Sequence, residues 1–501
     1  MKRLLTLLFS LSVMTCFGQN TQAADSLRNE YKAEMRSVSR VFEALFYPNR
    51  PAIHSLKESQ FLSKIDSLKQ PFVTVTQKYD APFQTIDASF IPTQLRDIDY
   101  FFDGIILSYP YFHENHTSKK VQLSKPTQTR LDQHLEDFNN PALLSSEDFR
   151  GYVEGFLRHK STEEVKKAQY KKSDNKRLDA YLNLVPRYFT NEQCREYWQY
   201  HYLRAHLEDW GSKNMEKAVK TFLTTSQNKV HVKTIDSLYV ESANSYKGHI
   251  IKTYKTVDGV ALDLHIFLPD SASLKSKRPV MVFFSGGSWT KGTPEWDFYN
   301  AANYARKGWV GVAVEYRIAD RHETKPFEAV KDARSAIRWL RLNADAYNLD
   351  PNRIIATGNS AGGHLVLSTA LAESVNERSD KLSISPVPNL LLVNAGVYSL
   401  YADGSTDWIS KGLKDKTEVK KISPQHLLKP GLPPMLILHG THDQSVDYAS
   451  AKAFVEAMTQ LGNEVEFHTF EGAPHTIWWD RRYSGQVASF RKEFLKKNGY
   501  E

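Results

Sequence analysis

Cysteine is nearly absent from this sequence. The 501 residues contain only Cys16 and Cys194, so a framework of several disulfides is excluded. No Cys-x-x-Cys motif occurs, which also excludes a thioredoxin-type redox site. The surrounding "NEQCREYW" is typical of a helix face, so we interpret Cys194 as a structural cysteine and not as a catalytic thiol.

Long apolar runs are missing too, apart from the N-terminus, and the mean hydropathy is negative. The chain opens with two basic residues after Met1 and an apolar stretch from Leu4 to Met14. Cys16 and Gly18 are the small residues expected at positions −3 and −1 of a signal-peptide cleavage site before Gln19. This pattern predicts a signal peptide over residues 1–18, and therefore export to the periplasm or the cell exterior. The alternative is a lipoprotein, in which Cys16 would carry a lipid that anchors the chain to the outer membrane.

The charge balance is only mildly basic. Lys and Arg number 65 against 57 Asp and Glu, which gives a net charge of +8. The densest basic run, "KKAQYKKSDNKR" from Lys166 to Arg177, contains no base-reading motif and is typical of a solvated surface, so we expect no nucleic-acid partner. Histidines in the first half, such as His113 and His116, do not stand at metal-ligand spacing within a helix, and we expect no metal site there.

The pattern of the sequence changes near residue 245. Residues 25–245 contain segments such as "SVSRVFEALF" and "FRGYVEGFLR", whose apolar residues recur three and four apart. This spacing predicts helices. We expect residues 25–245 to form a mostly α-helical N-terminal accessory domain.

Residues 248–499 alternate strand and helix patterns. "HIIKTYKTVDGVALDLHIFLPD" predicts a hairpin with Asp258 and Gly259 at its turn. "RPVMVFFSGG", "WVGVAVEYR" and "RIIATG" are continuous apolar runs, as strands buried on both faces require. "PFEAVKDARSAIRWLRLNA" has a helical stripe and Pro326 at its start. The fold class predicted is α/β, with a mainly parallel, doubly wound sheet.

One serine lies among glycines in "ATGNSAGGHL". The strand "RIIATG" precedes Ser360 and the helix "AGGHLVLSTALAE" follows it, so the serine occupies a sharp strand-to-helix turn. Gly358 and Gly362 stand two residues before and after, where the strand and the helix must approach closely. A Walker-type phosphate loop is excluded, because no Gly-Lys-Ser/Thr follows. We interpret Ser360 as a nucleophile.

A serine nucleophile needs a base and an acid that orients the base. Asp443 follows the apolar run "PPMLILHG", and His475 lies in "EGAPHTIWW" after another strand pattern. Both come after Ser360, in the chain order Ser, Asp, His that α/β-hydrolases use. We choose them over the other acid and the other histidines of this region, which are Asp447, His439, His442 and His468.

A further glycine-rich segment, "FFSGGSWTKG", ends the strand pattern that begins at Arg278. Its position predicts an oxyanion hole built from the amides of Gly286, Gly287 and Ala361. Trp289 follows directly, and Trp478 with Trp479 follows the candidate base. These three tryptophans either form an aromatic wall for a sugar ring or take part in ordinary packing.

These motifs resemble one known group. "FFSGGSWTKG", "AVEYRIADRHETKPFEAVKDARSAIRWLR", "GNSAGGHL", "HGTHDQSVDYASAKAFVEAM" and "GAPH" are similar to the α/β-hydrolase carbohydrate esterases of bacterial polysaccharide degradation, the acetyl-xylan and feruloyl esterase-like set. The resemblance covers about residues 248–499. It implies an α/β-hydrolase fold and an acyl-serine hydrolase with Ser360, Asp443 and His475 as the catalytic triad. Ser285 replaces the histidine that usually opens the oxyanion loop.

The sequence therefore predicts an exported serine carboxylic-ester hydrolase that removes acetyl or feruloyl groups from plant polysaccharide or oligosaccharide. The chemistry needs no metal or organic cofactor. A serine peptidase of the prolyl-oligopeptidase type is the alternative, although such enzymes usually carry a β-propeller before the hydrolase domain. A catalytically silent binding protein is the third hypothesis.

Overall fold

A computed structural model describes residues 21–170, 173–270, 276–400, 407–411 and 413–500. The expected signal peptide and Cys16 lie outside these residues. The chain divides into two compact units between Tyr202 and Leu203, inside helix α9 (Glu192–Trp210). The sequence pattern places the change near residue 245 instead, because helices continue to that point. Helices α10 (Glu216–Thr225) and α11 (Lys229–Ser245) are nonetheless part of the second unit.

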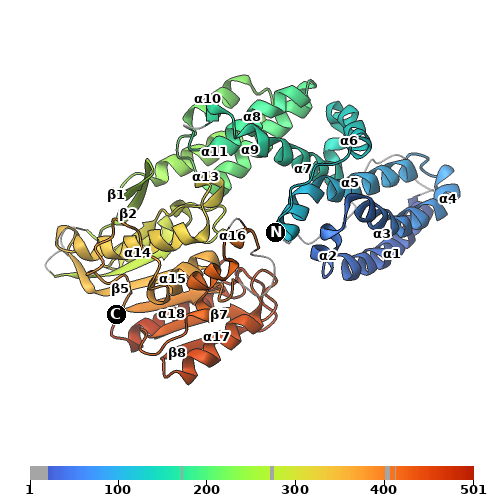
Figure 1. Cartoon of the computed structure of the whole chain (residues 1–501). Helices are drawn as coiled ribbons and strands as arrows, with labels where there is room; N and C mark the ends of the chain where they lie inside the picture. Colours follow the sequence, from blue (N-terminus) through green and yellow to red (C-terminus); the bar gives the residue numbers. More distant parts are fainter. Residues whose placement is uncertain (1–20, 171–172, 271–275, 401–406, 412, 501) are drawn as a thin grey trace. The chain divides into compact units, whose positions relative to one another are not determined.

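Among the described residues of the first unit, the regular elements are all helices (Figure 1). Its helices before α9 are α1 (Thr21–Phe46), α2 (Arg50–Ser55), α3 (Glu58–Lys78), α4 (Asp80–Gln84), α5 (Phe90–Thr117), α6 (Lys125–Asp132), α7 (Glu147–Glu164) and α8 (Lys176–Tyr188). Aromatic rings fill its core: Phe42 of α1 packs edge-on against Phe72 of α3 and Phe102 of α5. Such edge-to-face packing is a favoured geometry for aromatic pairs.

The second unit contains one eight-stranded sheet with helices on both faces (Figure 1). Its strands are β1 (Ile250–Val257), β2 (Val260–Phe267), β3 (Arg278–Phe284), β4 (Val310–Val314), β5 (Leu349–Asn359), β6 (Leu390–Asn394), β7 (Met435–Gly440) and β8 (Val465–Phe470). Its helices after α11 are α12 (Phe298–Arg306), α13 (Ala319–His322), α14 (Pro326–Leu342), α15 (Ala361–Leu371), α16 (Asp407–Ser410), α17 (Tyr448–Gln460) and α18 (Ser484–Lys497).

The strand order is β1-β2-β4-β3-β5-β6-β7-β8. Strands β1 and β2 form the predicted antiparallel hairpin, with Asp258 and Gly259 at positive φ in its turn. Strand β2 pairs antiparallel with β4, and the pairs from β4 through β3 to β8 are all parallel. This order, with the nucleophile candidate after β5, is that of the α/β-hydrolase fold, as predicted.

The two faces of the sheet bury separate apolar cores. Alternate residues of β3 point to opposite sides, because successive side chains of a strand do so. Val280 and Val282 pack in the core that α14, α15 and α17 cover, and Met281 and Phe283 pack in the core that α12 and α18 cover. Burial on both faces explains the continuous apolar runs in the sequence.

Within the described part of the chain, no helix combines the length and the apolar character needed to cross a membrane.

Candidate active site

Ser360 lies where β5 ends and α15 begins. Its φ of 54° and ψ of −121° place it in a strained backbone conformation. A Cβ on Gly358 would come within 2.4 Å of the Gly362 backbone, and one on Gly362 would come within 1.9 Å of the carbonyl oxygen of Phe284. Both positions therefore require glycine, as the sequence pattern predicts, and the turn holds Ser360 at the N-terminus of α15.

Asp443 and His475 are brought together by the loops that follow β7 and β8. The Nδ1 atom of His475 lies 2.6 Å from Oδ2 of Asp443. The Asp443 side chain is fully buried, whereas that of His475 is 17% exposed. Because a carboxylate only accepts, Nδ1 donates the hydrogen, which leaves Nε2 of His475 free to act as a base.

Asp443 has more partners than sequence reasoning assigns to it. Its Oδ1 atom accepts hydrogen bonds from the amides of Ser445 and Val446. Nε2 of the buried His439 lies 3.3 Å from Oδ2. Burial alone would raise the pKa of Asp443, but the hydrogen bonds from His439 and His475 outweigh it and hold that pKa below its usual range. The carboxylate is therefore charged when it orients His475.

The other candidates of this region have different roles. Asp447 caps α17, since its side chain accepts a hydrogen bond from the amide of Ala449. His468 lies within β8 and contacts the carboxylate of Glu466 at 2.8 Å. His442 is exposed on the Asp443 loop. His475 is thus the histidine that faces the tip of Asp443 from a second loop.

The loop after β3, where the sequence predicts an oxyanion hole, lies beside Ser360. Gly287, Ser288 and Trp289 all have positive φ. A Cβ on Gly286 would lie 3.5 Å from Cβ of Ser360, so this loop passes directly beside the serine. Within the described residues, the amides of Ser288 and Trp289 donate no hydrogen bond, and neither do those of Gly286, Gly287 and Ala361. The last three are the donors that the sequence predicts.

One contact of the predicted triad is not formed in this structure. Among the described residues, the Ser360 hydroxyl makes no hydrogen bond to His475, although each lies at the end of its own strand or loop on the same edge of the sheet. Catalytic hydrogen bonds are often long without substrate and tighten in the complex. The assignment of the three residues to one triad remains our proposal.

A connector formed by residues 208–213, which are the last turn of α9 and the residues that follow it, contacts the oxyanion loop from outside. Its residue Asp209 contacts Nζ of Lys291 at 2.6 Å and accepts the amide of Gly292 at 3.1 Å. The indole of Trp296 donates to another connector carbonyl at 3.0 Å. Sequence reasoning missed this segment, because no motif in residues 208–213 marks it.

Of the three tryptophans considered for an aromatic wall, Trp289 lies in the interior of the fold. Trp289 is only 4% exposed and packs edge-on against the buried His364. Its ring is therefore covered by the fold, which does not support the wall position that the sequence suggested.

Trp478 and Trp479 do lie beside the candidate base. Trp478 packs edge-on against His475, with 5.4 Å between ring centroids, and Trp479 is 63% exposed. Trp296 extends this surface, since its ring lies 6.4 Å from that of Trp479. No pattern in the sequence indicated Trp296, which lies 183 residues before Trp479 along the chain and contacts it only in the fold.

Residues 264–458 match the family model described as BD-FAE. The match lies within the second unit. Among curated proteins, the chain is 29% identical over 214 residues to esterase LipC of Mycobacterium tuberculosis, which covers 39% of this chain and 52% of LipC. It is 26% identical over 233 residues to the isoprenylcysteine alpha-carbonyl methylesterase ICME of Arabidopsis thaliana, covering 42% and 53%.

Among solved structures, an esterase from Thermogutta terrifontis with bound propionate is 36% identical, with a TM-score of 0.47, covering 51% of this chain and 96% of that one. The chain spans about half the length of the curated relatives it matches.

Proposed function

We propose that this protein is an exported serine carboxylic-ester hydrolase that removes acetyl or feruloyl groups from plant polysaccharide or oligosaccharide. The observation that carries the proposal is the buried Asp443 carboxylate bonded to Nδ1 of His475, on the sheet edge where the strained Ser360 begins α15. The similarity of the BD-FAE region to esterases supports ester chemistry.

In the proposed mechanism, Oγ of Ser360 attacks the ester carbonyl carbon while Nε2 of His475 takes its proton. The carbonyl oxygen becomes negative and is stabilised by the amides of Gly286, Gly287 and Ala361. The carbon–oxygen bond of the ester breaks, and His475 returns the proton to the departing alkoxide. A water molecule then repeats the sequence and releases the acid.

The carbohydrate part of the proposal is supported by the exposed ring of Trp479 and the partly exposed rings of Trp296 and Trp478, because aromatic rings that reach solvent stack well on sugar faces. Export is supported by the N-terminal sequence pattern. Mass analysis of the protein recovered from the periplasm or the medium tests it: cleavage before Gln19 is expected, and a lipid on Cys16 would favour the anchored form.

The substrate class is tested with a panel that uses equal amounts of enzyme. It comprises acetylated xylan, feruloylated arabinoxylan oligosaccharides, p-nitrophenyl acetate and a dipeptide anilide. Release of acetate or ferulate with little anilide cleavage is the expected result. Anilide cleavage alone would establish a peptidase instead, and no turnover of any substrate, together with retained polysaccharide binding, would establish a binding protein.

A further inference from the structure

Tyr316 follows β4 and reaches the oxyanion loop. Its buried hydroxyl donates to the carbonyl oxygen of Ser285 at 2.7 Å and lies 3.1 Å from that of Gly286. These are consecutive peptide units. In a trans peptide unit the N–H points away from the C=O. Because Tyr316 binds the carbonyls of Ser285 and Gly286, the N–H groups of Gly286 and Gly287, which belong to the same two peptide units, point away from Tyr316.

We propose that Tyr316 is a positioning residue for the oxyanion hole, fixing the amides of Gly286 and Gly287 for the tetrahedral intermediate formed at Ser360. The inference rests on the proposed function. A glycine pair has little conformational preference of its own, so the orientation of these peptide units must come from outside the loop. Tyr316 supplies it through one shared hydroxyl.

The residues on either side of Tyr316 are themselves held in place. The carbonyl oxygen of Glu315 accepts the buried hydroxyl of Tyr254 at 2.8 Å. The amide of Arg317 donates to Oδ2 of Asp332 at 2.9 Å, and the Arg317 guanidinium binds the same carboxylate through two further hydrogen bonds. The backbone that carries Tyr316 is thus fixed before and after the tyrosine.

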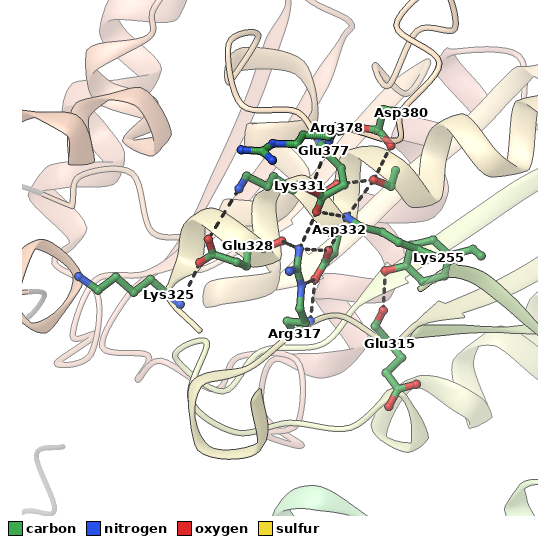
Figure 2. A network of polar contacts seen from close by, with 12 residues as sticks. Lys255, Glu315, Arg317, Lys325, Glu328, Lys331, Asp332, Glu377, Arg378 and Asp380 are labelled. Carbon is green, nitrogen blue, oxygen red and sulfur yellow. Dashed lines mark hydrogen bonds and ion pairs between the residues drawn. The ribbon is translucent and has the colours of Figure 1, made fainter. Parts of the chain in front are cut away.

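Figure 2 shows the ion network that anchors this segment. The carboxylate of Asp332 lies between Arg317 and Nζ of Lys255, at 2.7 Å from each, and Glu377 contacts both cations at 3.0 Å. Burial opposes the charge on Arg317, but the two carboxylates outweigh it and raise its pKa above the usual range. A paired, buried network of this kind is costly to disturb, so it makes a rigid support.

The hydroxyl of Tyr316 stays a donor over the whole range in which an esterase is assayed. The side chain is 4% exposed. Burial raises its pKa above the usual range for tyrosine, more than the hydrogen bond to Ser285 lowers it. The carbonyls of the loop therefore meet a neutral O–H at every working pH.

The test is Tyr316→Phe in the full-length chain, which removes the hydroxyl and keeps the ring. We expect kcat for p-nitrophenyl acetate to fall about 10- to 100-fold, less than the ~10²–10³-fold cost of deleting an oxyanion donor itself. KM should change little, because the ground-state ester does not use the hole fully. Rates are expressed per active site counted from the burst of p-nitrophenol, so partial unfolding does not affect them.

Tyr109→Phe is the matched control. Tyr109 is equally buried, and its hydroxyl donates to the carbonyl oxygen of Leu56 at the same 2.7 Å, in the unit without the catalytic candidates. It reports the structural cost of losing such a hydrogen bond, and its kcat should equal that of the wild type.

A trifluoromethyl ketone separates positioning from a general structural role. Its adduct with serine places an oxyanion in the hole, so Tyr316→Phe should weaken its binding by the same factor as kcat/KM, while inhibition by acetate stays unchanged. The inference is overturned if kcat/KM per site stays within about threefold of the wild type, or if acetate binding weakens as much as ketone binding. A wild-type chain that shows no burst would overturn the proposed function itself, and the inference with it.

Discussion

At Ser360 the backbone adopts a conformation that L-residues rarely take, with φ of 54°. The strain persists because glycines at 358 and 362 let β5 and α15 approach to contact distance. The serine hydroxyl then stands beside the first amides of α15, which have no helical acceptor. These free amides can stabilise a negative charge that develops next to the Ser360 hydroxyl.

The environment of Asp443 predicts a pH dependence of stability. Its pKa is lower in the folded chain than the unfolded value of about 4. The resulting stabilisation is complete above the unfolded value and disappears as pH falls through the folded value. Urea unfolding at pH 7 and pH 3 should therefore show a smaller loss of unfolding free energy for Asp443→Asn than for the wild type.

Asp447→Asn is the control for this measurement, because it changes an acid in the same loop that caps α17. It should lose as much unfolding free energy between the two pH values as the wild type. An Asp443→Asn variant with the wild-type pH dependence would show that the carboxylate gains nothing from His439 and His475.

Among the elements, the crossing of α15 over β3 and β5 decides whether the site forms. A methyl group on Gly362 would meet backbone oxygen at 1.9 Å, and backbone cannot move aside. Gly362→Ala should lower the free energy of unfolding by about 3 kcal/mol, the upper end of the cost of overpacking. Gly485→Ala in α18, where nothing lies within 4 Å, should be neutral or slightly stabilising. Equal unfolding midpoints in urea for the two variants would contradict the close crossing.

The connector of residues 208–213 is the second decisive element. Gly211 has φ of 78°, and a Cβ there would come within 2.1 Å of Oε1 of Glu295, the atom that accepts the amide of Ser212. Gly211→Ala should therefore displace the connector and lower esterase activity as well as stability.

Gly462→Ala is the control for this change, since Gly462 has φ of 80° but nothing within 4 Å of its Cβ position. It should cost only the backbone strain, about 1–2 kcal/mol, and leave kcat per site unchanged. Full activity in Gly211→Ala would mean that the connector does not shape the oxyanion loop.

The sequence predicts which segments of the second unit are helices and which are strands. It predicts less well where each helix or strand ends. The strands of the second unit follow from apolar runs, and the β1–β2 turn follows from Asp258 and Gly259. A proline inside a helix usually marks its end, yet α8 continues through Pro186 to Tyr188, because packing of an apolar face can offset one lost backbone hydrogen bond. Tyr316 was part of a quoted motif, but its role depends on a contact with residues about 30 positions earlier in the chain.

For the whole molecule, the scarcity of cysteine has a direct consequence. Cys194 is fully buried in α9, and burial raises the pKa of its thiol. Within the residues that the structure describes, Cys194 is a free cysteine that forms no disulfide. Iodoacetamide should label it only after unfolding, as measured by peptide mapping. Labelling of the native protein would show that α9 opens near the junction between the units.

The boundary between the two compact units differs from the domain limit that the sequence pattern predicts. Helical periodicity continues to residue 245, so nothing local distinguishes α10 and α11 from the helices before them. What assigns them to the second unit is a set of long-range contacts, such as that between Ser242 and Glu295. The triad candidates, in contrast, follow strand ends in a fixed order, so the sequence pattern indicates them, whereas the contacts of Trp296 and His439 depend on three-dimensional proximity.

The central claim is that Ser360, Asp443 and His475 act as one acyl-transferring unit. The most direct measurement is rapid quenching after mixing with p-nitrophenyl acetate, followed by intact-mass analysis and peptide mapping. The account predicts one acetyl group per chain, on Ser360, and almost none in Ser360→Ala or His475→Ala. Acetylation at another residue, or acetylation of Ser360 at the wild-type rate in His475→Ala, would contradict it.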